Sequence, residues 1–382
     1  MNRTIRLSLV VLLLLTVTTG CWNLREPDQL AFILAAGLDL NEEGKLEITS
    51  QIAVPAAISS GQSPGGSGKK SFVVVSGTGK NVMDAGTNLQ TQLPRSLFYA
   101  HRQSILIGER LARKGLGSLT DMFIRNPKSE MRSSILVVKD GLAKDVLAIE
   151  PLFDPYISTM LVREQVAVGL KPYYYRQFLA DALCQATQPI LPAVSVLPTK
   201  RYIYSGAAIL NKDDNLKLVG YLNPKESFLA SWIIGRQNSL TVTAPVGAGG
   251  DEITLNAKSL SKELQFVMQD PPSMYVMLKG AGFIVENNTK LNPAKDRDLN
   301  KIEHALSLST QEAVQALVEK VQKQYKADVL GFGEYIHREH PYQWKELRSD
   351  WTTLFPRLRV TVKVELKVKD PGQTNSSIDS ML

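Results

Sequence analysis

A cysteine that directly follows a short apolar leader is the feature that most limits how this chain can fold. Arg3 and Arg6 precede an apolar run over residues 7–15, and short side chains then lead to Cys21. A basic start, a short apolar segment and small residues before a cleavage point are typical of a secretory signal. A helix needs about 20 apolar residues to cross a bilayer, and this run is shorter. We therefore expect residues 1–20 to be a signal peptide.

Cys21 would then become the first residue of the mature chain. Gly20 and Cys21 match the lipobox pattern of bacterial lipoproteins, although Thr18 stands where leucine is usual. This pattern predicts that the Cys21 thiol receives a diacylglycerol. The alternative is an ordinary secreted protein in which the cysteine is incidental.

Cys184 is the second of only two cysteines. With lipid on Cys21 no internal disulfide can form, so hydrophobic cores must stabilise the fold. About 360 residues remain after cleavage, too many for one core, which indicates two or three domains. Loss of two arginines and no acid lowers the formal charge from +7 to +5. This mildly basic charge is compatible with a position near anionic lipid headgroups, but it is not the strongly basic character of a nucleic-acid-binding protein.

Apolar patterning predicts most of the secondary structure. Alternating or continuous apolar runs predict strands at 30–38, 46–54, 71–76, 104–108, 134–139, 202–210, 216–221, 239–244, 253–268 and 275–285. Helical spacing predicts helices at 81–93, 111–123, 142–147, 156–168, 174–186 and 224–234. Ser309 and Glu312 form a capping-box pattern, which predicts a helix that begins there.

The last strand pattern, over residues 358–368, is the clearest in the chain. Apolar residues alternate strictly with charged or polar ones, so one face would lie on a core and the other in water. That alternation is typical of an antiparallel sheet. Proline-rich residues 189–198 and the glycines at 247–250 suggest boundaries. We expect an N-terminal α+β domain at 21–199, a small middle α+β domain at 200–250, a C-terminal α+β domain with an antiparallel sheet at 251–369, and a disordered tail at 370–382.

Two loop patterns mimic catalytic motifs. Residues 61–65 match the G-x-S-x-G of serine hydrolases, but Ser63 lies in a Gly/Ser-rich tract that no predicted strand enters. Residues 77–80 resemble a phosphate loop, but they lack the earlier glycine, and Asn81 stands where Ser or Thr should hold magnesium. A tight turn into a helix explains residues 77–80 better.

The histidines and tyrosines also fall short of an active site. His337 and His340 supply only two possible ligands, which does not make a metal site. The run of three tyrosines at 173–175 could stack on a ligand, but a half-buried helix start is the more common role. We therefore expect no catalytic, metal-binding or cofactor-binding residues.

With those residues laid out, the chain resembles the Ger(x)C family of spore germination lipoproteins, the C subunits of nutrient germinant receptors. Similarity begins at Gly20-Cys21-Trp22 and continues through 97–108 (LFYAHRQSILIG), the Phe123-Ile124-Arg125 and Glu130-Met131-Arg132 segments, 322–332 (QKQYKADVLGF), and the region of Trp344, Trp351 and Phe355. Thr18 and Pro27 depart from the family pattern. His101, Arg125 and Arg132 are expected to make structural contacts rather than partner contacts. The two tryptophans are expected to lie in a core.

By this resemblance the fold would be a multidomain α+β body of about three domains, with mixed and antiparallel sheets flanked by helices. Lipid on Cys21 would hold the protein on the outer face of the spore inner membrane. It would assemble with integral-membrane A and B subunits to trigger germination, and a nutrient would be a ligand of the whole receptor. The main alternative is a lipoprotein solute-binding protein of an uptake transporter, which would need two lobes with parallel sheets.

Overall fold

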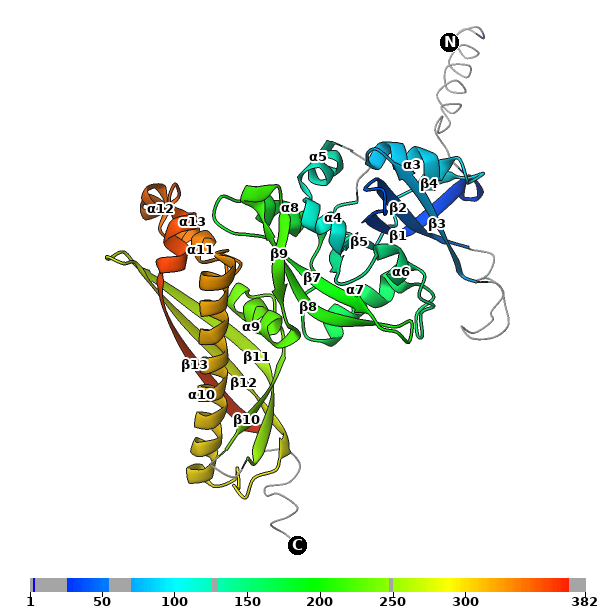
Figure 1. Cartoon of the computed structure of the whole chain (residues 1–382). Helices are drawn as coiled ribbons and strands as arrows, with labels where there is room; N and C mark the ends of the chain where they lie inside the picture. The colour runs from blue at the N-terminus through cyan, green and yellow to red at the C-terminus, as the bar shows by residue number, and fades with distance from the viewer. Residues whose placement is uncertain (1–2, 4–25, 55–69, 126–129, 247–249, 371–382) are drawn as a thin grey trace.

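A computed structural model of the chain describes residues 3, 26–54, 70–125, 130–246 and 250–370. Apart from residue 3, the predicted signal peptide lies outside this part, as do the predicted lipidation site Cys21, Ser63 and residues 371–382 of the predicted tail. The described part contains two β-sheets, one after the other along the chain, with helices packed on both (Figure 1).

The first sheet has nine strands in the order β3-β2-β1-β5-β6-β7-β8-β9, with β4 beside β1. Strands β1, β5, β6 and β7 run parallel, whereas the flanking pairs are antiparallel, so the sheet is mixed. Nearly every residue of β1 is buried, as expected for a continuous apolar run at the centre of a sheet. The strands are β1 Leu30–Leu40, β2 Leu46–Ala53, β3 Phe72–Gly79, β4 Ser96–Phe98, β5 Ser104–Gly108, β6 Ser134–Val138, β7 Ile190–Val196, β8 Tyr202–Asn211 and β9 Lys217–Leu222.

Helices cover both faces of the first sheet. Successive residues of β5 point to opposite faces, so Ile105 and Ile107 join one core and Leu106 joins the other. The first core also contains residues of α3, α4, α5 and α8, and the second contains residues of α6 and α7. These helices are α3 Val82–Gln90, α4 Glu109–Lys114, α5 Gly117–Arg125, α6 Ala143–Leu147, α7 Ile157–Ala167 and α8 Tyr175–Leu183.

The second sheet has four strands in the order β10-β11-β12-β13, and the long helix α10 lies along it (Figure 1). Strand β13 pairs parallel with β12, so the expected antiparallel C-terminal sheet is instead mixed. The connection from β12 to β13 contains α10 and three short helices, which is long enough to return the chain to the same end of the sheet. The bounds are β10 Leu240–Pro245, β11 Glu252–Val267, β12 Ser273–Asn287, α10 Asp296–Lys320 and β13 Arg359–Asp370.

One large hydrophobic core joins the two sheets. Ile209 of the first sheet and Leu255 and Val276 of the second belong to it, together with Trp232 of α9. The Trp232 indole nitrogen donates a 3.0 Å hydrogen bond to the Ser261 carbonyl, so this large buried ring is also held by a polar contact. The remaining elements are α9 Pro224–Ile234, α11 Phe332–Glu339, α12 Pro341–Leu347, α13 Trp351–Leu354 and the short turns η1 Pro27–Gln29, η2 Lys212–Asp214, η3 Val321–Tyr325 and η4 Phe355–Arg357.

Three local predictions are wrong. Residues 190–196, expected to be irregular because of their prolines, form β7. Residues 77–79, expected to be a turn, end β3. Helix α10 begins at Asp296 and not at the expected Ser309 cap. The expected boundary at 199/200 falls between β7 and β8, which are hydrogen-bonded neighbours in the first sheet.

Candidate functional site

The most elaborate polar network of the described chain surrounds Asp328, between the two sheets. The side chain is 3% exposed and accepts three hydrogen bonds. The backbone nitrogens of Phe332 and Gly333 donate to it at 3.1 and 2.7 Å. The indole nitrogen of Trp351 donates at 3.2 Å. One carboxylate therefore connects the start of α11 to α13.

Two glycines make this arrangement possible. Gly331 has φ of 74°, a left-handed conformation that glycine adopts without the penalty of a side chain. The backbone can then turn back so that the next amides reach Asp328. At Gly333 a Cβ atom would lie 2.3 Å from the Ala186 carbonyl oxygen. Only glycine therefore lets α11 lie this close to the segment between α8 and β7.

The backbone of Asp328 also contacts the segment between α8 and β7. Its carbonyl accepts hydrogen bonds from the Gln188 amide and the Thr187 hydroxyl, both at 2.9 Å. Lys212 donates to the carbonyl oxygens of Thr187, at 2.9 Å, and of Cys184. Together these residues form the junction network: Cys184, Thr187, Gln188, Lys212, Asp328, Phe332, Gly333 and Trp351. A cavity of about 670 Å³ adjoins it, and Arg348 also lines that cavity.

The electrostatics of the junction network do not favour nucleophilic chemistry. Burial raises the pKa of Asp328 to about 6, and its hydrogen bonds oppose a larger rise. Burial also raises the pKa of the Cys184 thiol to about 11, helped by its 2.9 Å hydrogen bond to Glu334. A thiol with so high a pKa is protonated at neutral pH and is a poor nucleophile. The network is suited to holding the two sheets in one arrangement.

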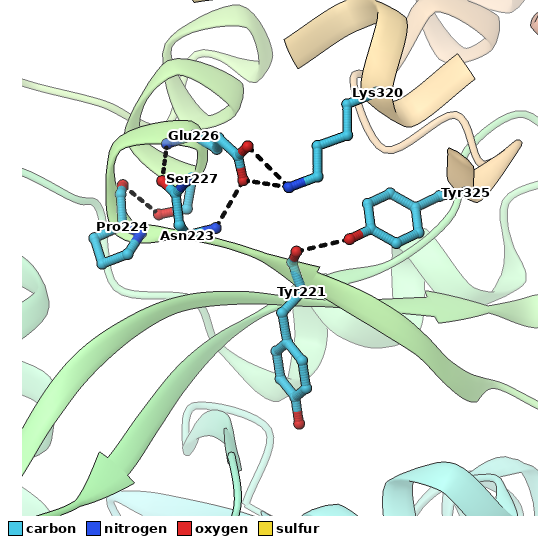
Figure 2. Close-up of polar contacts among 7 residues, drawn as sticks. All are labelled: Tyr221, Asn223, Pro224, Glu226, Ser227, Lys320 and Tyr325. Carbon is cyan, nitrogen blue, oxygen red and sulfur yellow. Dashed lines mark hydrogen bonds and ion pairs between the residues drawn. The ribbon is translucent and has the colours of Figure 1, made fainter. Parts of the chain in front are cut away.

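A second polar contact ties α9 to the end of α10 (Figure 2). Asn223 and Glu226 form a capping box, with reciprocal hydrogen bonds of 2.8 and 2.9 Å. The same Glu226 carboxylate pairs with Lys320 at 2.8 Å through both oxygens. Close by, the Tyr325 hydroxyl donates to the Tyr221 carbonyl at 2.9 Å. The last turn of α10 is thus fixed to the start of α9, and the following η3 is fixed to β9.

The phosphate-loop resemblance at residues 77–80 has a packing explanation. Cβ atoms at Gly77 and Gly79 would lie 2.5 and 2.2 Å from the backbone of Ala85, so the glycines let α3 lie directly on β3. Asn81, in the position where Ser or Thr would hold magnesium, is the N-cap of α3 and accepts a 2.9 Å hydrogen bond from the Asp84 amide.

The histidines and tyrosines have structural contacts. His337 lies against Trp344, and His340 lies against Phe266. Across the described ranges, no three His, Cys, Asp or Glu residues group as metal ligands would. The tyrosines lie at the start of α8, as predicted, but Tyr173 and Tyr175 are only 3% and 1% exposed and so are more buried than the expected half-buried helix start.

Trp344 and Trp351 are 2% and 6% exposed, which confirms their predicted place in a core. The rings meet edge to face, 5.5 Å apart, from two different helices. Arg125 is exposed and pairs with Asp121, and His101 lies against Phe32 and Phe98.

Sequence reasoning missed Asp328 and the buried Arg102. The signal at Arg102 is a charged residue two positions before the buried strand β5, and at Asp328 it is a lone acid among apolar neighbours.

Two family models match adjacent parts of the chain. The model described as spore germination protein N-terminal domain matches residues 23–196, and the model described as spore germination B3/GerAC like, C-terminal, matches residues 205–372. The chain belongs to the GerAC/GerBC-like family of spore germination proteins.

Full-length relatives agree with this membership. Spore germination protein KC of Bacillus subtilis (strain 168) is 25% identical, with 99% of this chain and 98% of that protein aligned. Spore germination protein B3 of the same organism is 24% identical over 95% of this chain and 97% of its own length. The crystal structure of the GerBC protein matches with a TM-score of 0.59 and 20% identity, over 87% of this chain and 96% of that one. The predicted α+β class, with sheets flanked by helices, is confirmed, and both sheets are mixed.

Two of the segments that carry the family resemblance meet in the junction network. Asp328, Gly331 and Phe332 come from the 322–332 segment, and Trp351 comes from the tryptophan pair. In this member of the GerAC/GerBC-like family, the 322–332 segment and the tryptophan pair therefore have a structural role. In the described part of the chain, no helix combines the length and the apolar character needed to cross a membrane.

Proposed function

We propose that this protein is the lipid-anchored C subunit of a spore nutrient germinant receptor and that its role is not catalytic. It is attached through Cys21 to the outer face of the spore inner membrane. There it assembles with integral-membrane A and B subunits, and the assembly starts germination when nutrient binds.

The observation that carries this proposal is the pair of adjacent family models, which together span nearly the whole mature chain. The site geometry agrees with a non-catalytic role, because the junction network holds a protonated thiol and a fully hydrogen-bonded carboxylate. Neither group has the activated state that a nucleophile needs.

A lipid tether explains how modest contacts would suffice for assembly. Confinement to the membrane plane raises the effective concentration of the protein near its partners, so each contact face can be small. Trp22, next to the anchor in sequence, is of the residue type that favours the headgroup region.

The two cysteines permit a matched test of the anchor. Wild-type, Cys21→Ala and Cys184→Ala proteins are expressed in a spore former that is fed alkyne-tagged palmitate. Wild type and Cys184→Ala should carry the label and stay with the inner membrane, and Cys21→Ala should lose the label and be poorly retained. Equal labelling of Cys21→Ala and wild type, or an unlabelled wild type, would contradict the lipid anchor.

A further inference from the structure

A second cavity, of about 300 Å³, lies between α3, α5 and the face of the first sheet. Its floor is formed by Leu38 of β1 and Ile48 of β2, and Phe123 of α5 forms one wall. On the α3 side the lining includes Val82 and Gly86, one helical turn apart. Most of this lining is apolar, and the volume lies at the lower end of the range for small-molecule sites.

Arg102 is the one cationic residue among those that line this cavity. Its side chain is only 6% exposed. Nε donates to the Ser133 hydroxyl at 3.1 Å, and Nη2 makes a long 3.4 Å contact with the Glu130 carbonyl. Within the described ranges, Nη1 has no hydrogen-bond acceptor. The Glu130 carboxylate acts on the guanidinium electrostatically but forms no salt bridge with it.

A buried cation without a paired anion is unusual, because burial of an unpaired charge is costly. Burial lowers the pKa of Arg102 to about 10, so the guanidinium is still charged at neutral pH. The face of the Phe123 ring, 5.2 Å away, provides only part of the missing stabilisation. Arg102 therefore has no salt-bridge partner among the described residues, and it lines a mostly apolar cavity.

We propose that this cavity binds a small molecule with one carboxylate and a compact apolar body. The carboxylate pairs with the open side of the Arg102 guanidinium, which suits planar, two-oxygen acceptors. The apolar body lies against Leu38, Ile48 and Phe123. Tyr99, which also lines the cavity, supplies a second residue with a polar group. A multiply charged phosphate ligand is not favoured, because Arg102 is the only cation in the lining.

This site does not depend on the receptor assignment, because it follows from the side chains of the cavity alone. Its test can therefore fail while the receptor role holds, and the reverse is also true.

Gly86 allows the cavity to be filled without disturbing the fold. A Cβ atom at Gly86 meets no other atom within 4 Å, so a larger side chain there would extend into open cavity space. Replacing glycine within a helix also favours the helical conformation. Gly86→Leu is the blocking variant, and Gly86→Ala is its small control. Arg102→Gln removes the charge while keeping a long polar side chain.

The experiment measures ligand-induced thermal shifts and calorimetric binding on the full-length protein in detergent micelles. The probes are hexanoate and phenylacetate, and the neutral controls are hexanol and phenylethanol, each tested to about 10 mM. The carboxylates should bind wild type and Gly86→Ala saturably, at least about tenfold more tightly than the alcohols, because a charged hydrogen-bonded pair is lost with the alcohol. Arg102→Gln should bind the carboxylates about tenfold more weakly.

Gly86→Leu should lose carboxylate binding while its melting temperature equals or exceeds that of wild type. This variant decides the question even if Arg102→Gln does not fold. Failure of wild type to bind either carboxylate, or equal binding by wild type and Gly86→Leu, would overturn the proposed site. Equal binding of carboxylates and alcohols would overturn the role of Arg102.

Discussion

The Trp351 indole nitrogen donates a 3.2 Å hydrogen bond to the buried carboxylate of Asp328. Asp328 lies in the irregular segment between η3 and α11, and Trp351 begins α13. The backbone carbonyl of Asp328 also accepts hydrogen bonds from the segment that leads into β7. The pair therefore connects two of the segments that resemble the family, and it does so where the two sheets contact each other.

Replacing this indole tests how much the junction network contributes to stability. Trp351→Phe keeps an aromatic ring but removes the donor and part of the buried volume. We expect the free energy of unfolding to fall by about 2–3 kcal/mol, measured by chemical denaturation at neutral pH. The control is Tyr342→Phe in the neighbouring α12, where the side chain is 81% exposed and should matter by less than about 0.5 kcal/mol. Equal losses in both variants would contradict a special role for Trp351.

Asp328 should give stability an unusual pH dependence. Its pKa is about 6 in the folded state, against an ordinary value of 3.8 that applies when unfolded. Between these values the folded state holds a proton that the unfolded state has released, so this group makes the free energy of unfolding fall as pH rises from about 4 to about 6. The full effect is about 3 kcal/mol.

Asp328→Asn isolates this effect because asparagine does not titrate in that range. The difference in unfolding free energy, wild type minus Asp328→Asn, should decrease by about 2 kcal/mol between pH 4 and pH 7, because part of the full effect lies below pH 4. The constant cost of the substitution cancels in this comparison. A difference that stays flat with pH would show that Asp328 does not have a raised pKa.

The Glu226–Lys320 pair should couple α9 to α10. Glu226→Gln keeps a residue able to complete the capping box but loses the ion pair, whereas Glu226→Ala loses both. Because the two side chains are only 22% and 28% exposed, we expect a coupling energy of about 1 kcal/mol in a double-mutant cycle with Lys320→Gln. Glu226→Ala should cost about 1 kcal/mol more than Glu226→Gln, owing to the lost cap. A coupling energy near zero would mean that the Glu226–Lys320 contact in Figure 2 does not stabilise the packing of α9 against α10.

Gly79 and Gly86 make a matched glycine pair. Gly79→Ala would put a Cβ atom 2.2 Å from the Ala85 backbone nitrogen, and neither backbone can move freely, so α3 must separate from β3. We expect a loss of at least about 2 kcal/mol in the free energy of unfolding. Gly86→Ala, in the same region but with open space, should be neutral or stabilising by up to about 1 kcal/mol. If Gly79→Ala were as stable as Gly86→Ala, the packing explanation of residues 77–79 would be wrong.

Elements with a complete local pattern could be predicted from the sequence. The helix Pro224–Ile234 has proline at its start, a capping box and a following glycine, and its bounds are as predicted. Strand β13 shows the predicted alternation of buried and exposed residues. Its parallel partner could not be predicted, because alternation reports which face is buried and not which strand lies beside it.

Where local signals compete, the sequence prediction failed. Pro192 argued against a strand, but β7 pairs with β6 only from Ala193 onward, so the missing amide hydrogen costs that ladder nothing. Ser309 matched a cap, but the burial of Ile302 and Leu306 shows that the apolar face of α10 begins earlier. Within a helix such hydroxyls bond back to the preceding turn, as Thr310 does to the Leu306 carbonyl.

The candidate sites depended on contacts between distant residues. Asp328, Trp351 and Gln188 are far apart in sequence and meet only in the folded chain, so their spacing in sequence gives no sign of the network. The sequence does not distinguish the buried Arg102 from the exposed Arg125, because Arg102 becomes buried only when helices pack on one face of the first sheet.

The receptor-subunit role is tested most directly by co-purification. The tagged protein is recovered from detergent-solubilised spore inner membranes, and the proteins that accompany it are quantified by mass spectrometry. A receptor subunit should bring down two integral-membrane proteins, corresponding to the A and B subunits, in near-equal amounts. Recovery of the protein alone, or together with an ATP-driven permease, would contradict that role and favour nutrient capture for an uptake transporter.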